Sequence, residues 1–174
     1  MLAIWIKIDS EGPVFYRQVR VGKGNRDFQL FKFRSMRVGS DQKGLITVGG
    51  RDPRVTRSGY YIRKYKLDEL PQLINVFIGD MSLVGPRPEV RKYVDLYTPE
   101  QMHVLDVRPG ITDLASIRYR NENELLAQVE DPDHYYVEVI MQDKLQLNLE
   151  YVEKQSFRFD LQLIFKTFSE IIRK

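Results

Sequence analysis

The chain has 174 residues, of which 43% are hydrophobic and 29% are charged, as expected for one globular domain. It contains no cysteine, which excludes disulfides, thiolate metal sites and a cysteine nucleophile, and it has only two histidines. The net charge of +3 is unevenly distributed, because residues 1–66 carry 15 Lys and Arg against 5 Asp and Glu. This basic first third indicates either an anionic partner (nucleic acid, a phosphorylated small molecule or a membrane surface) or a solvated basic face.

The first eight residues are apolar apart from Lys7, and they include Trp5. This pattern is typical of the end of a longer hydrophobic segment at a membrane interface. A short core strand or a frayed terminus fits as well. Two β-prone runs follow, over 14–21 and 28–36, and the glycine-containing residues 22–27 between them predict a hairpin.

The next segments have helical patterns. Residues 58–66 predict a short helix with Ser58 as its N-cap. Residues 67–77 place their apolar side chains on one helical face, and Pro71 is tolerated only in a first turn. This predicts Asp68 at the N-cap and Glu69 in the first turn.

The remaining chain predicts further helices over 121–129, 135–148 and 157–172. The last of these has an apolar stripe that can pack on the core or lie on a membrane, and we favour the core. The expected fold class is α+β, with a small hairpin or sheet surrounded by several helices.

Four residues form the candidate site: Arg63, Asp68, Glu69 and Arg87. An Asp can attack phosphorus, a neighbouring Glu can hold Mg²⁺, and arginines clamp phosphate oxygens with paired hydrogen bonds. Together they have the groups that phosphoryl transfer needs. Taken alone, the acid pair fits better as an N-cap with a favourable first-turn acid than as a catalytic pair.

Several sequence blocks closely resemble the bacterial sugar transferase family, the small monotopic phosphoglycosyl transferases. In chain order they are Lys32-Phe-Arg-Ser-Met36, Asp52-Pro-Arg-Val-Thr-Arg-Ser-Gly59, Leu67-Asp-Glu-Leu-Pro-Gln72, Gly79-Asp-Met-Ser-Leu-Val-Gly-Pro-Arg-Pro88 and Arg108-Pro-Gly-Ile-Thr112.

The resemblance implies an Mg²⁺-dependent enzyme that transfers a phospho-sugar from a UDP-sugar to a polyprenol phosphate, with undecaprenyl phosphate as the expected acceptor, and releases UMP. It implies that Asp68 is a nucleophile forming a covalent phospho-sugar intermediate and that Glu69 helps to bind Mg²⁺. Arg63 and Arg87 are expected to bind phosphate or nucleotide. Lys32 and Arg34, in the basic first third, are further candidates for contacts with substrate or lipid phosphate.

The resemblance also implies a monotopic domain on the cytoplasmic face of the bacterial inner membrane, in contact with its lipids, at the first membrane step of glycan assembly. We expect residues 1–8 to be the tail of a membrane-inserted, re-entrant helix and residues 9–174 to be one catalytic domain, so that this chain is a soluble piece of a longer protein. Many relatives carry Gly and Gln where Asp113 and Ser116 stand. If these positions approach the sugar, the sugar preference of this chain differs.

The alternative hypothesis is a basic nucleic-acid-binding module without catalytic activity, supported by the basic first third and the hairpin. It gives no role to Asp68 and Glu69, whose charges repel phosphate in the absence of a metal. We therefore expect no nucleic-acid partner. A membrane-peripheral scaffold without activity is a third interpretation, and the intact sequence blocks argue against it.

Overall fold

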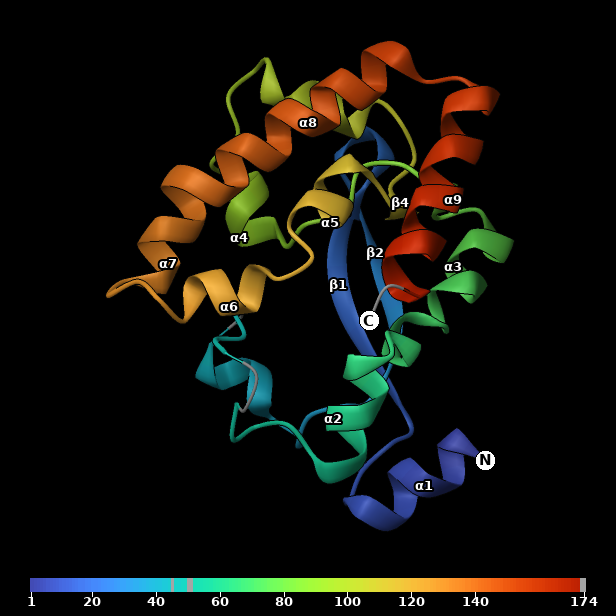
Figure 1. Cartoon of the computed structure of the whole chain (residues 1–174), viewed down its shortest axis with the longest axis vertical. Coiled ribbons are helices and arrows are strands. Elements are labelled where there is room, and N and C mark those ends of the chain that lie inside the picture. The colour runs from blue at the N-terminus through green and yellow to red at the C-terminus, as the bar shows by residue number, and fades with distance from the viewer. Residues whose placement is uncertain (45, 50–51, 173–174) are drawn as a thin grey trace.

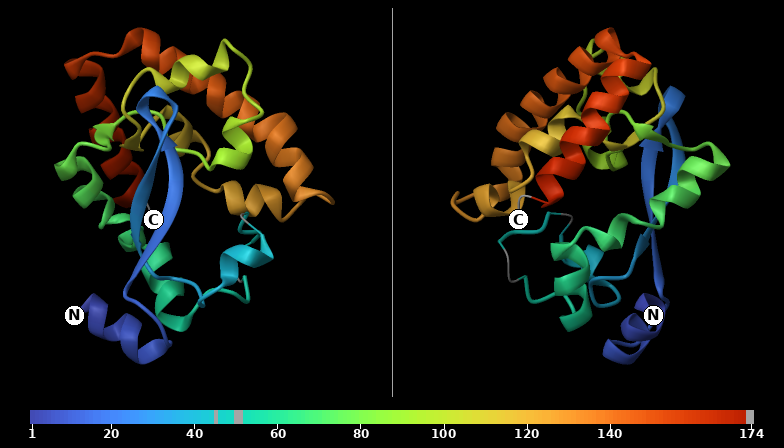
Figure 2. Two further views of the ribbon diagram at one scale, coloured as in Figure 1. Left: turned by 180° about the vertical axis from the view of Figure 1, so that it is seen from behind. Right: turned by 45° about the vertical axis from the view of Figure 1, so that its right-hand side comes forward.

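A computed structural model describes residues 1–44, 46–49 and 52–172. The chain combines helices with a long antiparallel hairpin, which lies on one face of the molecule, and a short pair of parallel strands (Figure 1, Figure 2), which confirms the α+β prediction. The strands are β1 (Phe15–Gly22), β2 (Arg26–Phe33), β3 (Ser82–Val84) and β4 (Gly110–Thr112). The α-helices are α1 (Leu2–Asp9), α2 (Arg57–Lys64), α3 (Gln72–Ile78), α4 (Arg91–Val94), α5 (Leu114–Arg118), α6 (Glu122–Leu126), α7 (Pro132–Tyr135), α8 (Met141–Lys154) and α9 (Phe157–Ile172). Among the residues described, no helix has the length and apolarity needed to cross a membrane.

The predicted hairpin is confirmed. Its connection needs left-handed backbone at Gly24, with φ 66°, and at Asn25, with φ 61°. Glycine and asparagine adopt this conformation more readily than other residues. β2 ends at Phe33, earlier than predicted, because Met36 leaves the hairpin and bridges to Val55.

The free edge of β2 is covered by a side chain of α3. Asn75 is fully buried, and its Oδ1 accepts a hydrogen bond from the N–H of Phe31 at 3.0 Å. Its Nδ2 donates to the carbonyl of Gln29 at 2.8 Å. These two bonds fix α3, and the chain leading into it, against the hairpin.

The larger hydrophobic core lies among α4, α6 and one long helical stretch. This stretch consists of α7, a π-helical segment (Tyr136–Ile140) and α8 in succession. Its buried residues are Val90, Tyr93, Val104, Leu126, Tyr136, Ile140, Met141 and Leu145. A smaller core contains Val84 of β3, Tyr151 of α8 and Leu163 of α9. β3 and β4 pair in parallel between these two cores.

The predicted helix over 67–77 is divided in the structure. A 3₁₀ turn (Leu67–Glu69) is followed by Pro71, and α3 begins only at Gln72. Proline has no N–H and its ring clashes with the carbonyl four residues earlier, so a helix can begin at Pro71 but cannot continue through it. Asp68 is therefore not the N-cap of α3. α2 begins one residue earlier than predicted, with Thr56 as N-cap in place of Ser58.

Two helices carry exposed apolar faces, and for one of them, α9, we favoured packing on the core. On α9, Leu163 is buried and Ile164 of the predicted stripe packs on the smaller core, but most of the stripe is exposed, so the prediction that it packs on the core holds only in part. The exposed side chains of α9 are Phe157, Leu161, Phe165 and Phe168. On and just before α3, the exposed apolar side chains are Leu70, Leu73, Ile74, Phe77 and Ile78. The smaller core takes up one face of α9, and the opposite apolar face remains in solvent.

Candidate active site

The acid pair lies on the 3₁₀ turn between α2 and α3. The chain leaves α2 through Lys66, whose φ of 56° places it in the left-handed region. This conformation costs free energy for a residue other than glycine, and such residues are concentrated at functional sites. The sharp turn buries Asp68, which is 7% exposed, and directs Glu69 toward the loop that follows β3.

Glu69 and Arg87 form a two-point ion pair. Nη1 of Arg87 donates to Oε2 of Glu69 at 3.2 Å, and Nη2 donates to Oε1. Burial alone would raise the pKa of Glu69, but the charges of Arg87 and Lys32 outweigh it and lower the pKa to about 2. The negative charge of Glu69 in turn raises the pKa of Arg87. Both groups are therefore ionised throughout the neutral range.

Asp68 is in the opposite situation. Burial and the adjacent charge of Glu69 raise its pKa, and Lys32, Arg63 and Lys66 only partly offset the rise. Its Oδ1 is buried and has no hydrogen-bond partner within the described part of the chain. A buried carboxylate oxygen without a partner costs free energy, so its retention needs an explanation. Within the described residues, Glu69 is thus bonded to Arg87, whereas Oδ1 of Asp68 accepts no hydrogen bond.

Two lysines place positive charge beside the acid pair. Burial lowers the pKa of Lys32, on β2, to about 8, although the charges of Glu69 and Asp68 oppose this. Burial also lowers the pKa of Lys66. The structure therefore brings the predicted Lys32 to the acid pair, and it adds Lys66, which we did not predict. A lysine next to an acid pair is too common in sequences to indicate this.

The two other predicted arginines differ in position. Arg63, in the last turn of α2, donates to Thr47 Oγ1 at 3.3 Å and lies close enough to lower the pKa of Asp68. Arg34 is 4% exposed, and its guanidinium donates to main-chain carbonyls of Ile6, at 3.2 Å, and Ser10, at 2.7 Å. Carbonyls at a helix end need donors, and Arg34 supplies them for α1. The expectation that Arg34 contacts phosphate is corrected: its side chain is committed to α1.

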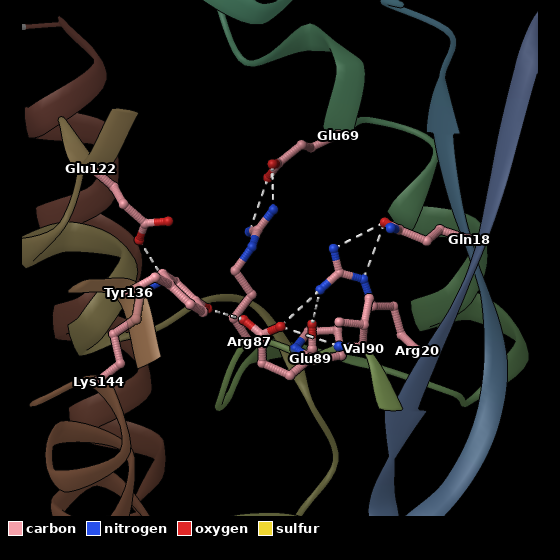
Figure 3. Close-up of polar contacts among 10 residues, drawn as sticks. Gln18, Arg20, Glu69, Arg87, Glu89, Val90, Glu122, Tyr136 and Lys144 are labelled. Carbon is pink, nitrogen blue, oxygen red and sulfur yellow. Dashed lines mark hydrogen bonds and ion pairs between the residues drawn. The ribbon is translucent and has the colours of Figure 1, made fainter. Parts of the chain in front are cut away.

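The loop that carries Arg87 is held by a half-buried network that we did not predict (Figure 3). Glu89 accepts from the hydroxyl of Tyr136 at 2.6 Å and from Nη1 of Arg20 at 3.3 Å. Arg20 also donates to the carbonyl of Pro88 at 3.0 Å. The charges of Arg20 and Lys144 hold the pKa of Glu89 below its ordinary value even though burial raises it. These residues come from three distant segments, so no local pattern in the sequence indicates that they meet.

Comparison with known proteins identifies the family. The model of the bacterial sugar transferase family matches residues 1–174. The chain belongs to the bacterial sugar transferase family. It is 42% identical, over 98% of its length and 38% of the relative, to a UDP-N-acetylgalactosamine-undecaprenyl-phosphate N-acetylgalactosaminephosphotransferase of Aeromonas hydrophila. It is 36% identical, over 95% of its length and 34% of the relative, to the UDP-glucose:undecaprenyl-phosphate glucose-1-phosphate transferase of Escherichia coli.

A further relative is shorter. The chain is 37% identical, over 96% of its length and 74% of the relative, to the uncharacterized sugar transferase EpsL of Bacillus subtilis. The chain thus spans little more than a third of the two longer relatives and about three quarters of this one. The sequence blocks that suggested this sugar transferase family include the acid pair and Arg87, which the structure brings together.

The acid pair offers few ligands, and it suits a metal ion whose other ligands are water and substrate phosphates. The described residues contain no group of three or more Asp, Glu and His that could hold an ion on their own. Mg²⁺ commonly takes one or two carboxylates and completes its shell with water and substrate phosphates. Each oxygen of Glu69 accepts one bond from Arg87 and keeps a further lone pair, and Oδ1 of Asp68 lies beside it without a partner. The residues present fit such an ion.

Proposed function

We propose that this sugar transferase moves a phospho-sugar from a UDP-sugar to a polyprenol phosphate, undecaprenyl phosphate by analogy with the named relatives, and releases UMP. The observation that carries the proposal is the buried Oδ1 of Asp68, which has no partner among the described residues and lies beside the ion pair of Glu69 and Arg87. The names of the relatives support the donor and acceptor classes.

The reaction has two displacements at one phosphorus atom. Oδ1 of Asp68 forms a bond to the phosphorus that carries the sugar, and the bond from that phosphorus to the bridging oxygen breaks, so that UMP leaves with the electron pair. An oxygen of the polyprenol phosphate then bonds to the same phosphorus, and the Asp68–phosphorus bond breaks and restores the carboxylate. Covalent catalysis of this kind divides one difficult step into two and lets the substrates enter in turn.

The other residues of the cluster bind and neutralise phosphate. Lys32, Arg63 and Lys66 surround Asp68 with positive charge, and they favour the ionised carboxylate as well as the anionic donor. Glu69 holds Arg87 in an extended position, where its remaining donors can meet phosphate oxygens. Mg²⁺, held by Glu69 together with substrate phosphates, would supply charge neutralisation at the diphosphate.

The exposed apolar helix faces support a membrane partner. α1, α3 and α9 follow one another along one side of the molecule, and the reverse view also keeps them on a common side (Figure 1, Figure 2). α1 adds Ile4, Trp5 and Ile8 to the exposed side chains of α3 and α9. Exposed apolar surface of this extent marks interaction sites. We propose that this side lies on lipid at the cytoplasmic face of the bacterial inner membrane, with residues 1–8 in contact with the membrane and residues 9–174 forming the catalytic domain.

The test uses the whole chain on vesicles containing undecaprenyl phosphate, with UDP-N-acetylgalactosamine and UDP-glucose as donors. We expect UMP release that requires Mg²⁺ and stops when a chelator is added. Without acceptor, intact mass should show one phospho-sugar added to the chain, and peptide mapping should locate it on Asp68. UMP release without any covalent adduct would argue for a direct transfer. An absence of UMP release with every UDP-sugar supplied would overturn the proposal.

A further inference from the structure

Asp113 is a fully buried carboxylate outside the acid pair. It stands between β4 and α5, and both of its oxygens accept hydrogen bonds from main-chain N–H groups. Oδ1 accepts from Ser116 at 2.5 Å, which caps α5. Oδ2 accepts from Arg87 at 2.9 Å. The second bond joins Asp113 to the main chain of the arginine that pairs with Glu69.

The parallel strands bring the two residues together. Val84 of β3 pairs with Thr112 of β4, and the N–H of Gly85 donates to the carbonyl of Thr112 at 3.0 Å. The segments that leave the two strands therefore run alongside each other. They pack so closely that a Cβ at Gly85 would lie 2.5 Å from the carbonyl oxygen of Arg108, which leaves room only for glycine. Asp113 thus faces Arg87 across two adjacent loops.

Three polar main-chain groups of residues 86–88 have hydrogen-bond partners: the N–H of Arg87 and the carbonyls of Pro86 and Pro88. Pro86 and Pro88 have no N–H, so the N–H of Arg87 is the one main-chain donor of this tripeptide, and Asp113 accepts it. The carbonyl of Pro86 accepts from Gly110 at 3.0 Å, and that of Pro88 accepts from Arg20 at 3.0 Å. The main chain that carries the Arg87 guanidinium is therefore fixed on both sides of the residue.

We propose that Asp113 is a positioning residue for phospho-sugar transfer: its Oδ2 holds the N–H of Arg87 and so fixes where the guanidinium meets Glu69 and phosphate. The inference rests on the proposed function of Arg87 as a phosphate-binding group. The charge of Asp113 also contributes to raising the pKa of Arg87. Its two bonds place Asp113 against main chain, so it acts on the arginine rather than on the sugar.

A purely structural role as the cap of α5 makes different predictions, and asparagine separates the two. Asp113→Asn keeps a good capping group, but it has one acceptor oxygen and cannot serve both Ser116 and Arg87. Asp113→Ser also caps a helix, and its side chain is too short to bridge to Arg87. Asp131→Asn is the matched control, because Asp131 caps α7 by accepting from the N–H of His134 at 3.0 Å, away from the acid pair.

The experiment measures kcat and KM for UMP release, together with Tm, for the whole chain and these variants. We expect Asp113→Asn and Asp113→Ser to lower kcat/KM by about tenfold to hundredfold, as small displacements of a catalytic group do. The control should keep wild-type kinetics. The same change is then made in an Arg87→Lys background, where the lysine cannot make the two parallel hydrogen bonds of a guanidinium. There Asp113→Asn should lower kcat/KM by less than about threefold, because the effects of two mutations are not additive when one residue acts through the other.

Equal losses in both backgrounds, or wild-type kinetics in Asp113→Asn, would overturn the inference. If the Asp113 variants do not fold, NMR of the unaltered ¹⁵N-labelled chain decides. The amide proton of Arg87 should be shifted downfield and protected from exchange, and an unprotected amide would overturn the proposal. Failure of the proposed function gives a separate result, because the unaltered chain would then release no UMP from either donor.

Discussion

At the scale of single residues, Asp68 and Glu69 are adjacent acids held in different states. The Arg87 pair lowers the pKa of Glu69, whereas burial and the charge of Glu69 raise the pKa of Asp68. Pairs of titratable groups whose surroundings separate their pKa values commonly have different roles in catalysis. Here one carboxylate is committed to an arginine, and the other retains a free oxygen.

Oδ1 of Asp68 is buried without a partner among the described residues, so we expect Asp68 to support activity at a cost in stability. Asp68→Asn has the same shape and removes a buried charge, so Tm should stay unchanged or rise. UMP release should fall at least about a thousandfold, because the nucleophile is lost. Thermal melts and initial rates check both, and Asp106→Asn, at an exposed carboxylate, is the control. An Asp68→Asn protein that still turns over would exclude Asp68 as nucleophile.

Lys32 predicts a pH dependence. Its pKa of about 8 means that it loses its charge near pH 8, so kcat/KM should fall as the pH rises through this value. Lys32→Arg stays charged, and it should move the fall to higher pH while lowering the maximum rate. Stability should behave differently: the unfolded chain keeps this proton up to its ordinary value of 10.5, so stability should rise between pH 8 and 10.5. A kcat/KM profile unchanged by Lys32→Arg would remove Lys32 from the site.

At the scale of elements, the Arg87 loop is joined to the hairpin and to the helical core by Glu89. The carboxylate meets Arg20 of β1 and Tyr136 of the π-helical segment, so it connects three elements that are distant in sequence. Arg20 and Glu89 are each 17% exposed, so removing one partner should destabilise the fold by less than the roughly 3–5 kcal/mol typical of a fully buried pair. The orientation of the loop therefore depends on packing far from the acid pair.

Glu89→Gln should lower the free energy of unfolding at pH 7, because it leaves the charge of Arg20 without its carboxylate. The pKa of Glu89 is lower in the folded protein than its ordinary value of 4.5. Its stabilisation is therefore present above that value and is lost as the pH falls through the folded pKa. Urea unfolding at pH 7 and pH 3 should show a large difference between variant and wild type at pH 7 and a smaller one at pH 3. An equal difference at both pH values would contradict a role for the charge.

Some of these elements could be predicted from local sequence patterns, and others could not. The hairpin and α9 follow from local runs and periodicity, which the structure confirms as secondary structure. The acid pair and Arg87 were found through sequence blocks, because nothing local indicates that they meet. Arg34 was misassigned because a basic residue between a β-prone run and a loop gives no sign that α1 lacks donors for its last carbonyls. Asp113 and Glu89 act through long-range contacts, which composition and periodicity do not encode.

At the scale of the whole molecule, apolar periodicity correctly identified the helical faces of α3 and α9 but did not show their environment, and for α9 we favoured the core. A face that packs on a core and a face that lies on lipid have the same period, and only the folded chain shows which one is covered. Phe77 is 91% exposed, although it belongs to the apolar face of α3. The side of the molecule formed by α1, α3 and α9 is therefore where a membrane partner is expected (Figure 2).

Phe77→Ser should weaken binding to vesicles that contain anionic lipid, because burying the ring in the interface contributes about 1.5–3 kcal/mol. Tm should not fall, since the side chain makes little contact within the folded chain. Vesicle flotation checks binding, and Leu96→Ser is the matched control, because Leu96 is 54% exposed and follows α4 on another part of the molecule. Equal flotation of Phe77→Ser and wild type would argue against lipid contact at α3.

The contact of Asn75 with β2 also bears on how copies of this protein behave toward one another. A strand edge with unpaired N–H and carbonyl groups is a template for a strand from another molecule, and proteins protect such edges. The amide of Asn75 makes the two bonds that an incoming strand would make with Phe31 and Gln29. This one side chain thus occupies the middle of the outer edge of β2, so a strand from another copy crowded beside it on a surface cannot pair with β2 there.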